Sequence, residues 1–172
     1  MELSQSHNHL YFSVLADCSE GWHGGCFNPL AEDWGLVVAK TILIVEDERL
    51  LARTLSTALK EAGYNAVVTH TAEQAGEKWL EGAVFDLVIL DNRLPKGSGL
   101  ELLQAARDSG RTSKVILMTA FGNRDVRAEA RRLGVDKYVR KPFDLDNMLR
   151  SVTELIGDPN NGGVEKSSKG GG

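Results

Sequence analysis

The stretch FDLVILDNRLPKGSGLELL, residues 85–103, decides the fold expected of this chain. It begins with an apolar run that leads straight into an acidic residue, Asp91, and continues into a turn rich in Pro, Gly and Ser. A short apolar run bounded by turn residues is typical of a buried strand. Ser98 and Glu101 then have the spacing of a capping box, which indicates that a helix begins there. The sequence thus predicts a buried strand that ends in a carboxylate.

The same alternation of strand and helix recurs between about residues 40 and 157. Further β-branched runs, TILIV, NAVVT, KVILM and KYV, alternate with longer stretches whose apolar residues recur at helical spacing. Thr71 and Gln74 have the spacing of a second capping box, and Asp144 is placed to cap the last helix. Five strand–helix units in alternation predict an α/β domain with a doubly wound, five-stranded parallel sheet and helices on both faces.

Two of the predicted helices have apolar residues along one face. The first is expected to stop at Gly63, and its apolar face consists of Leu51, Leu55, Ala58, Leu59 and Ala62. The apolar face of the last helix consists of Leu145, Met148, Leu149, Val152, Leu155 and Ile156. Both helices are therefore expected to pack against the sheet.

The length of 172 residues, the net charge of -4 and the 42% hydrophobic content are ordinary for one soluble domain with appendages. No apolar run approaches the ~20 residues that span a bilayer, and a signal-peptide pattern is missing, so we expect a cytoplasmic protein without a membrane partner. We place the domain at residues 38–157. Residues 1–37 are an atypical extension, expected to be disordered or loosely packed, and residues 158–172 are a flexible Gly/Ser-rich tail.

The N-terminal extension allows three interpretations. Its possible zinc ligands are His7, His9, Cys18, His23 and Cys26. Their spacing matches no paired Cys-x-x-Cys site, and two cysteines are too few for a disulfide framework. The second interpretation is a disordered extension whose aromatic residues rest on the domain. The third is a misplaced start, with translation beginning at Val38.

Polar residues stand where the predicted strands stop. Glu46 and Asp47 follow the first strand, and Asp91 ends the third. Thr119 ends the fourth strand, and Lys141 follows the fifth. In doubly wound sheets ligands bind beyond the carboxyl ends of the strands, at the point where strand order reverses. We therefore expect these side chains to meet at one edge of the sheet.

Three carboxylates at one edge repel one another unless a cation neutralises them. Oxygen ligands without a neighbouring His or Cys suit Mg²⁺, which keeps several waters and bridges to phosphate oxygens. Asp91 would then be a nucleophile that forms an aspartyl phosphate. Lys141 and Thr119 would hold the phosphoryl oxygens, because phosphoryl transfer depends on charge neutralisation and positioning.

Taken in order, these residues resemble the response-regulator receiver domains of bacterial two-component signalling. The resemblance covers Thr41–Ile156 and depends on the joint spacing of Glu46-Asp47, Asp91-Asn-Arg-Leu-Pro95, Met118-Thr119-Ala120, Gly134-Val-Asp-Lys-Tyr138 and Lys141-Pro142-Phe143. It implies a flavodoxin-like, CheY-like fold with strand order 2-1-3-4-5. It also implies a phosphorelay partner, which is a sensor histidine kinase or a phosphotransfer protein.

The resemblance implies a metal set and a phosphoacceptor. Asp91 is the expected phosphoacceptor and also a Mg²⁺ ligand. Asp47 is expected to bind Mg²⁺ directly, and Glu46 through water. The backbone carbonyl of Arg93 is the expected third protein ligand.

The resemblance also implies a switch. Thr119 and Tyr138 are the expected pair, in which the hydroxyl follows a phosphoryl oxygen and the ring swings inward. Ala120 is small enough to let a phosphoryl group approach. The Lys141–Pro142 peptide bond is expected to be cis, which aims the amine at the site.

Two other functions compete with this interpretation. A phosphatase of the haloacid dehalogenase type also has an aspartate after a buried strand, but its second aspartate would stand where this chain has Arg93. We therefore expect no enzyme beyond self-phosphorylation and self-dephosphorylation. The other alternative is an interaction module that works without phosphorylation. Each site residue also has a simple structural explanation as a turn former or solvated loop residue, but four such coincidences at one edge favour a phosphoacceptor site.

The fourth helix, in GNRDVRAEARRLG, is expected to place Val126, Ala130 and Leu133 inward. Its outward residues are Arg124, Arg127, Arg131 and Arg132. In the family this helix, the fifth strand and the fifth helix form the surface for a protein partner or a transcriptional output domain. A basic run without interleaved aromatics argues against direct nucleic-acid binding. The sequences TAFGN and KPFDLDNML are similar to those of receivers attached to σ54-dependent activators. Formation of a homodimer on phosphorylation is an alternative that the sequence leaves open.

Overall fold

The computed structural model describes residues 39–95, 97–120 and 124–159. One parallel sheet has the strand order β2-β1-β3-β6-β7, and its strands are β1 (Thr41–Val45), β2 (Asn65–Thr69), β3 (Leu87–Asp91), β6 (Lys114–Thr119) and β7 (Lys137–Arg140). The helices are α1 (Arg49–Glu61), α2 (Ala72–Trp79), α3 (Gly99–Asp108), α4 (Arg124–Arg132) and α5 (Leu145–Ile156). Because β4 (Arg93–Leu94) and β5 (Gly97–Ser98) form a separate two-stranded ladder, the predicted order 2-1-3-4-5 is confirmed.

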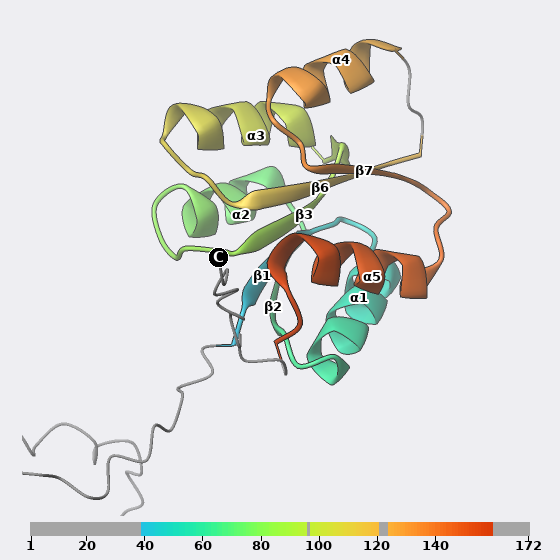
Figure 1. The fold of residues 1–172 in the computed structure, drawn as a ribbon. Helices are drawn as coiled ribbons and strands as arrows, with labels where there is room; N and C mark the ends of the chain where they lie inside the picture. Colours follow the sequence, from blue (N-terminus) through green and yellow to red (C-terminus); the bar gives the residue numbers. More distant parts are fainter. Residues whose placement is uncertain (1–38, 96, 121–123, 160–172) are drawn as a thin grey trace, which may run out of the picture. The chain divides into compact units, whose positions relative to one another are not determined.

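Helices cover both faces of the sheet, with α1 and α5 on one face and α2, α3 and α4 on the other (Figure 1). Successive residues of β1 supply the two cores in turn: Ile42 and Ile44 belong to the core beneath α1 and α5, and Leu43 and Val45 belong to the core beneath the other three helices. All residues of β3 are buried. Burial on both sides explains why these strands are continuously apolar, as the sequence predicted.

The predicted apolar faces of α1 and α5 lie in one core. Leu55 and Leu59 of α1 and Met148 and Val152 of α5 are buried there, and Ala58 of α1 is also buried. The remaining residues of both faces are partly buried against this core: Leu51, Ala62, Leu145, Leu149, Leu155 and Ile156. The hydroxyl of Tyr64 donates to the carbonyl of Gly157 at 2.8 Å, so the end of α5 is tied to the turn between α1 and β2.

The helix starts agree with the sequence except in one detail. Ser98 and Glu101 form the full capping box, and the Asp144 carboxylate accepts from the Asn147 N–H at 3.0 Å. Thr71 caps α2, but the amide oxygen of Gln74 accepts from the N–H of His70, one residue before the cap. The predicted reciprocal box at α2 is therefore wrong in its second half, because this side chain reaches past the cap residue.

Several expectations concern residues outside the described part of the chain. These are the extension at 1–37 with its zinc hypothesis, and all but the first two residues of the tail at 158–172. The domain boundaries therefore stay predictions. Within the described residues, no helix combines the length and the apolar composition needed to cross a bilayer.

Candidate functional site

The polar residues singled out in the sequence stand at the carboxyl ends of neighbouring strands. Glu46 directly follows β1, and Asp91 is the last residue of β3. Thr119 is the last residue of β6, and Lys141 directly follows β7. Since β1, β3, β6 and β7 are parallel neighbours, these ends share one edge of the sheet. The chain leaves β1 for β2 on one side and continues to β3 on the other, so strand order reverses between β1 and β3.

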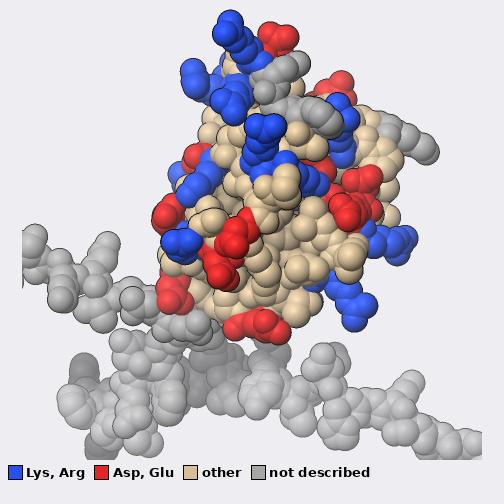
Figure 2. Space-filling model, turned by 90° about the vertical axis from the view of Figure 1, so that its right-hand side faces the viewer, with Lys and Arg blue, Asp and Glu red and all other residues tan. Residues whose placement is uncertain are grey.

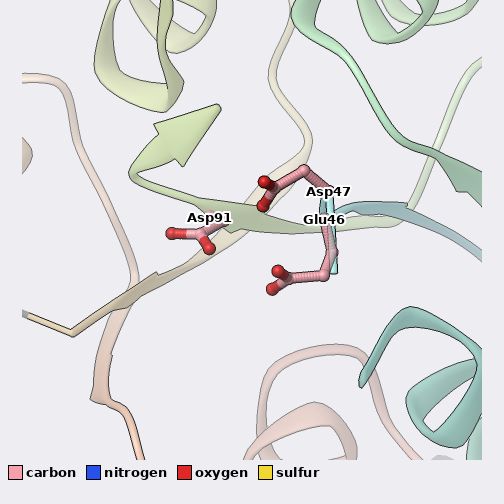
Figure 3. A group of neighbouring side chains, drawn as sticks. All are labelled: Glu46, Asp47 and Asp91. Carbon is pink, nitrogen blue, oxygen red and sulfur yellow. The ribbon is translucent and has the colours of Figure 1, made fainter. Parts of the chain in front are cut away.

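Three carboxylates meet at this reversal. Oxygens of Glu46, Asp47 and Asp91 all lie within 4.8 Å of one another. Figure 3 shows Glu46 and Asp47 extending from the end of β1 toward the side where Asp91 lies. Glu46 has no exposed surface and Asp91 is 6% exposed, whereas Asp47 is exposed. The group therefore has two buried carboxylates beneath one that meets solvent.

The ammonium of Lys141 lies between the two buried carboxylates. It donates to an oxygen of Glu46 at 2.6 Å and to an oxygen of Asp91 at 2.5 Å. These charge-assisted hydrogen bonds connect the ends of β1, β3 and β7. One ammonium against three carboxylates leaves a formal charge of two negative units when all are ionised.

Burial raises the pKa of the Glu46 carboxyl, and the charge of Asp91 adds to this effect, while the hydrogen bond from Lys141 opposes it without cancelling it. For the Lys141 ammonium, burial lowers the pKa, but the hydrogen bonds to Asp91 and Glu46 outweigh burial and the pKa is raised. Lys141 is thus held protonated, and Glu46 lies in an environment that disfavours its ionised form. A second cation would relieve that environment.

The loop after Asp91 is held by its own backbone. The Asp91 carboxylate accepts from the Arg93 N–H at 3.0 Å, and the Asn92 carbonyl accepts from the Gly99 N–H at 3.0 Å. A Cβ placed on Gly99 would lie 2.1 Å from the carbonyl oxygen of Asp91, well inside any real contact. Glycine at this position therefore lets the first turn of α3 close against the end of β3.

The expected switch residues lie on β6 and β7. The Thr119 side chain is buried, and its carbonyl accepts from the Lys141 N–H at 2.8 Å, while Ala120 is exposed. Tyr138 is half-buried and packs against the core beneath α4, and its hydroxyl is buried without a hydrogen-bond partner among the described residues. The Arg127 guanidinium lies 5.2 Å from the centre of its ring. The tyrosine ring is thus inward in this structure.

The peptide bond between Lys141 and Pro142 is cis. The amine of Lys141 contacts both buried carboxylates. Arg93 begins β4, and its backbone N–H is directed at Asp91.

His70 is a site residue that the sequence reasoning missed. It follows β2, and its Nδ1 lies 2.8 Å from the carbonyl oxygen of Glu46. This contact holds the backbone from which Glu46 and Asp47 extend. The rule that placed the acids at the carboxyl edge would have placed His70 there too, because it stands at the end of the strand NAVVT.

The donors at this edge fit Mg²⁺. They are the oxygens of three carboxylates, two of which are buried, and together they carry excess negative charge. No cysteine among the described residues lies with them. Hard oxygen donors of this kind are the ligands that Mg²⁺ prefers. Asp47 and Asp91 would hold the ion, with the exposed side of Asp47 leaving room for the waters that Mg²⁺ retains.

Residues 42–153 match the family described as response regulator receiver domain. The chain belongs to this family. The matched residues include all five strands of the sheet except Thr41, the first residue of β1, and the motifs identified above fall within them.

Similar curated proteins are transcriptional regulatory proteins. CpxR of Escherichia coli (strain K12) is 39% identical over 115 residues, which are 67% of this chain and 48% of CpxR. DltR of Streptococcus agalactiae serotype III (strain NEM316) is 34% identical over 111 residues, which are 64% of this chain and 49% of DltR. The chain therefore spans about half the length of the curated relatives it matches.

Solved receiver domains have the same fold. A CheY-like receiver domain protein from Methanospirillum hungatei JF-1 has a TM-score of 0.66 at 26% identity, covering 73% of this chain and 99% of that one. The response regulator TrrA from Thermotoga maritima, solved in complex with Mg(2+)-BeF, has a TM-score of 0.60 at 35% identity, covering 68% of this chain and 99% of that one.

Gly99→Ala should destabilise the receiver domain, because the new Cβ would meet backbone that cannot move without displacing Asp91. We expect a loss of about 1–3 kcal/mol in the free energy of unfolding, measured by urea titration. Gly76→Ala is the matched control, since its Cβ would meet only Leu80 at 3.8 Å inside α2. That variant should be stabilised by roughly 0.5–1 kcal/mol. Equal stability of the two variants would contradict the close packing of α3 on β3.

Glu46→Gln should reveal the unfavourable ionisation of Glu46. Since its pKa is raised in the folded state, stability contributed by this group is present below the ordinary value of ~4.3 and is lost as pH rises through the folded pKa. Glutamine does not titrate, so the variant should gain stability relative to wild type as pH rises across this window. Urea unfolding without Mg²⁺ between about pH 4 and pH 8 measures the difference.

Glu129→Gln is the control of opposite sign. A hydrogen bond from Arg132 lowers the pKa of Glu129. The contribution of Glu129 to folding stability is therefore present above the ordinary pKa and is lost as pH falls through the pKa of the folded state. This variant should lose stability relative to wild type as pH rises, and only slightly, because the pair is exposed. The same slope in both variants would contradict the charge balance described for Glu46.

Proposed function

We propose that this chain is a phospho-accepting receiver of a two-component phosphorelay, and that Asp91 takes the phosphoryl group. The observation that carries the proposal is the contact of Lys141 with both Asp91 and Glu46, beside the exposed carboxylate of Asp47. It puts a nucleophilic oxygen, a fixed positive charge and a set of metal ligands within one small volume.

The proposed reaction transfers a phosphoryl group from a sensor histidine kinase or a phosphotransfer protein. An oxygen of Asp91 forms a bond to the phosphorus of a phosphohistidine, and the bond from phosphorus to the histidine nitrogen breaks, leaving its electron pair on nitrogen. The Lys141 ammonium, already at Asp91, moves its contact to a phosphoryl oxygen. Asp47, Asp91, the Arg93 carbonyl and, through water, Glu46 are the proposed Mg²⁺ ligands. Mg²⁺, when bound, supplies neutralisation of the phosphoryl charge.

The proposed response to phosphorylation starts at Thr119. Thr119 is the last residue of β6, and in the proposal its hydroxyl follows a phosphoryl oxygen while the small Ala120 lets that group approach. The Tyr138 ring is already inward, so phosphorylation would favour this arrangement over others in a pre-existing equilibrium. Self-phosphorylation and self-dephosphorylation are the only chemistry in the proposal.

The proposed output surface consists of α4, β7 and α5. Val126, Ala130 and Leu133 face the core as predicted, and the arginines of α4 are exposed. Figure 2 shows Lys and Arg side chains gathered at the top of the molecule, where α4 lies in Figure 1. A downstream protein or a transcriptional output domain is the proposed partner, because the relatives are transcriptional regulatory proteins about twice as long. A second phosphorylated copy is a further proposed partner.

The cytoplasm is the proposed location, because transcriptional regulatory relatives act where genes are transcribed. Direct binding of this domain to nucleic acid is not proposed. The full chain has a net charge of -4, and acidic residues interrupt the basic helix.

Incubation of the full chain with acetyl phosphate and Mg²⁺, followed by intact-mass measurement, tests the proposed function. We expect one phosphoryl adduct on wild type and none on Asp91→Asn, because the amide is a poor nucleophile. Asp108→Asn, an exposed aspartate at the end of α3, is the matched control and should accept one adduct like wild type.

Two results would contradict the proposal. An adduct that persists in Asp91→Asn would place the phosphoacceptor elsewhere. Failure of wild type with several phosphodonors and kinases would instead indicate an interaction module, and release of many equivalents of phosphate from external substrates would indicate a phosphatase.

A further inference from the structure

A groove of about 420 Å³ runs along the outer edge of β7, between this strand and α5. All four residues of β7 line it, together with residues that include Phe143, Met148 and Ser151. The groove lies outside the carboxylate site, and Glu46, Asp47 and Asp91 are not among its lining residues. It therefore requires an explanation of its own.

Among the described residues β7 is the edge strand of the sheet, and β6 is its one neighbouring strand there. None of its residues is fully buried, whereas every residue of β3 is. Alternate residues of such a strand present their N–H and C=O groups away from the neighbouring strand. A free strand edge inside a groove is a template on which an extended segment can add as a further strand.

The groove carries positive charge. Its lining includes three cationic side chains, Lys137, Arg140 and Arg150, and one carboxylate, Glu154. Glu154 is paired with Lys137 at 2.6 Å, at one end of the strand. Three cations less one anion leave two formal positive charges, and Arg140 is exposed at the other end. The groove therefore complements an acidic occupant in charge.

We propose that this groove binds an extended acidic segment of a partner protein, which pairs with the free edge of β7. Carboxylates of the segment lie against Arg140 and Arg150, and an apolar side chain packs on the partly buried Phe143. The four-residue length of β7 corresponds to a segment of roughly four to six residues. The role of this partner in signalling rests on the proposed receiver function, but occupancy of the groove does not need phosphorylation.

Two other occupants fit less well. Two copies of β7 paired in antiparallel fashion would set Lys137 of each copy opposite Arg140 of the other, and like charges opposite each other destabilise a ladder. A nucleic-acid backbone would bring phosphates against the Glu154 carboxylate and the outward carbonyl groups of β7. An acidic peptide offers both N–H groups for those carbonyls and carboxylates for the arginines.

NMR titration of the full chain with the peptide acetyl-Glu-Val-Glu-Val-Glu-Val-amide, without phosphodonor, tests the proposal. We expect saturable shifts of the amides of β7, and a dissociation constant about tenfold weaker in Arg140→Glu. Arg131→Glu on α4 is the matched control, because it reverses another exposed arginine that does not line the groove, and it should change the constant less than about twofold. Asp91→Asn should bind like wild type, which separates this test from that of the phosphoacceptor.

Peptides with altered backbone or charge show whether strand pairing is involved. N-methylation of alternate residues should abolish binding in one register and spare it in the other, and a Lys-Val peptide of the same length should not bind. The proposal would be overturned by equal binding of the Lys-Val peptide, by equal effects of Arg140→Glu and Arg131→Glu, or by tighter binding of an oligothymidylate at the same amides. It would also be overturned if the outward amides of β7 exchanged slowly in the free chain, because the groove would then be filled by this chain or a second copy.

Discussion

The ammonium of Lys141 between two buried carboxylates is the interaction on which the functional edge of this domain depends. Glu46 and Asp91 end up inside the protein because their strands, β1 and β3, are adjacent in the centre of the sheet. Two buried carboxylates without a counter-ion would repel each other and lose hydration. A single cation from the end of β7 contacts both, and removal of such a partner typically costs about 3–5 kcal/mol.

That arrangement also explains why the site suits a phosphoryl group. Lys141 compensates only part of the negative charge, so the edge still attracts a divalent cation. Its ammonium is fixed by two hydrogen bonds and needs little reorganisation to meet a phosphoryl oxygen. The rigid parts are the strand ends, and the tight approach of Gly99 to Asp91 prevents the β3–α3 connection from drifting.

The fold and the membership of the site followed from sequence pattern because both obey simple geometric rules. Continuous apolar strands require two covered faces, and parallel strands put their last residues at one edge. Glu46, Asp47, Asp91, Thr119 and Lys141 could thus be grouped without coordinates. The ion-pair geometry of Lys141 could not be predicted from the sequence, because it depends on the path of the chain between β7 and α5 rather than on any local pattern.

Three other features were beyond sequence reasoning for related reasons. The contact of His70 with the Glu46 carbonyl depends on the pairing of β1 with β2, and the need for glycine at position 99 depends on a distance to β3. The exposed edge of β7 depends on how far α4 and α5 extend over it, which apolar periodicity does not specify. Each arises from the docking of elements, whereas the pattern rules describe one element at a time.

Calorimetric titration of the full chain with Mg²⁺, without phosphodonor, tests most directly whether these carboxylates form a cation site completed by Asp47. Wild type should bind one ion, and Asp47→Asn should bind it at least about tenfold more weakly, because a charged ligand is lost while the buried pair with Lys141 stays intact. Asp108→Asn should match wild type. Undetectable binding by wild type, or unchanged affinity in Asp47→Asn, would contradict the account.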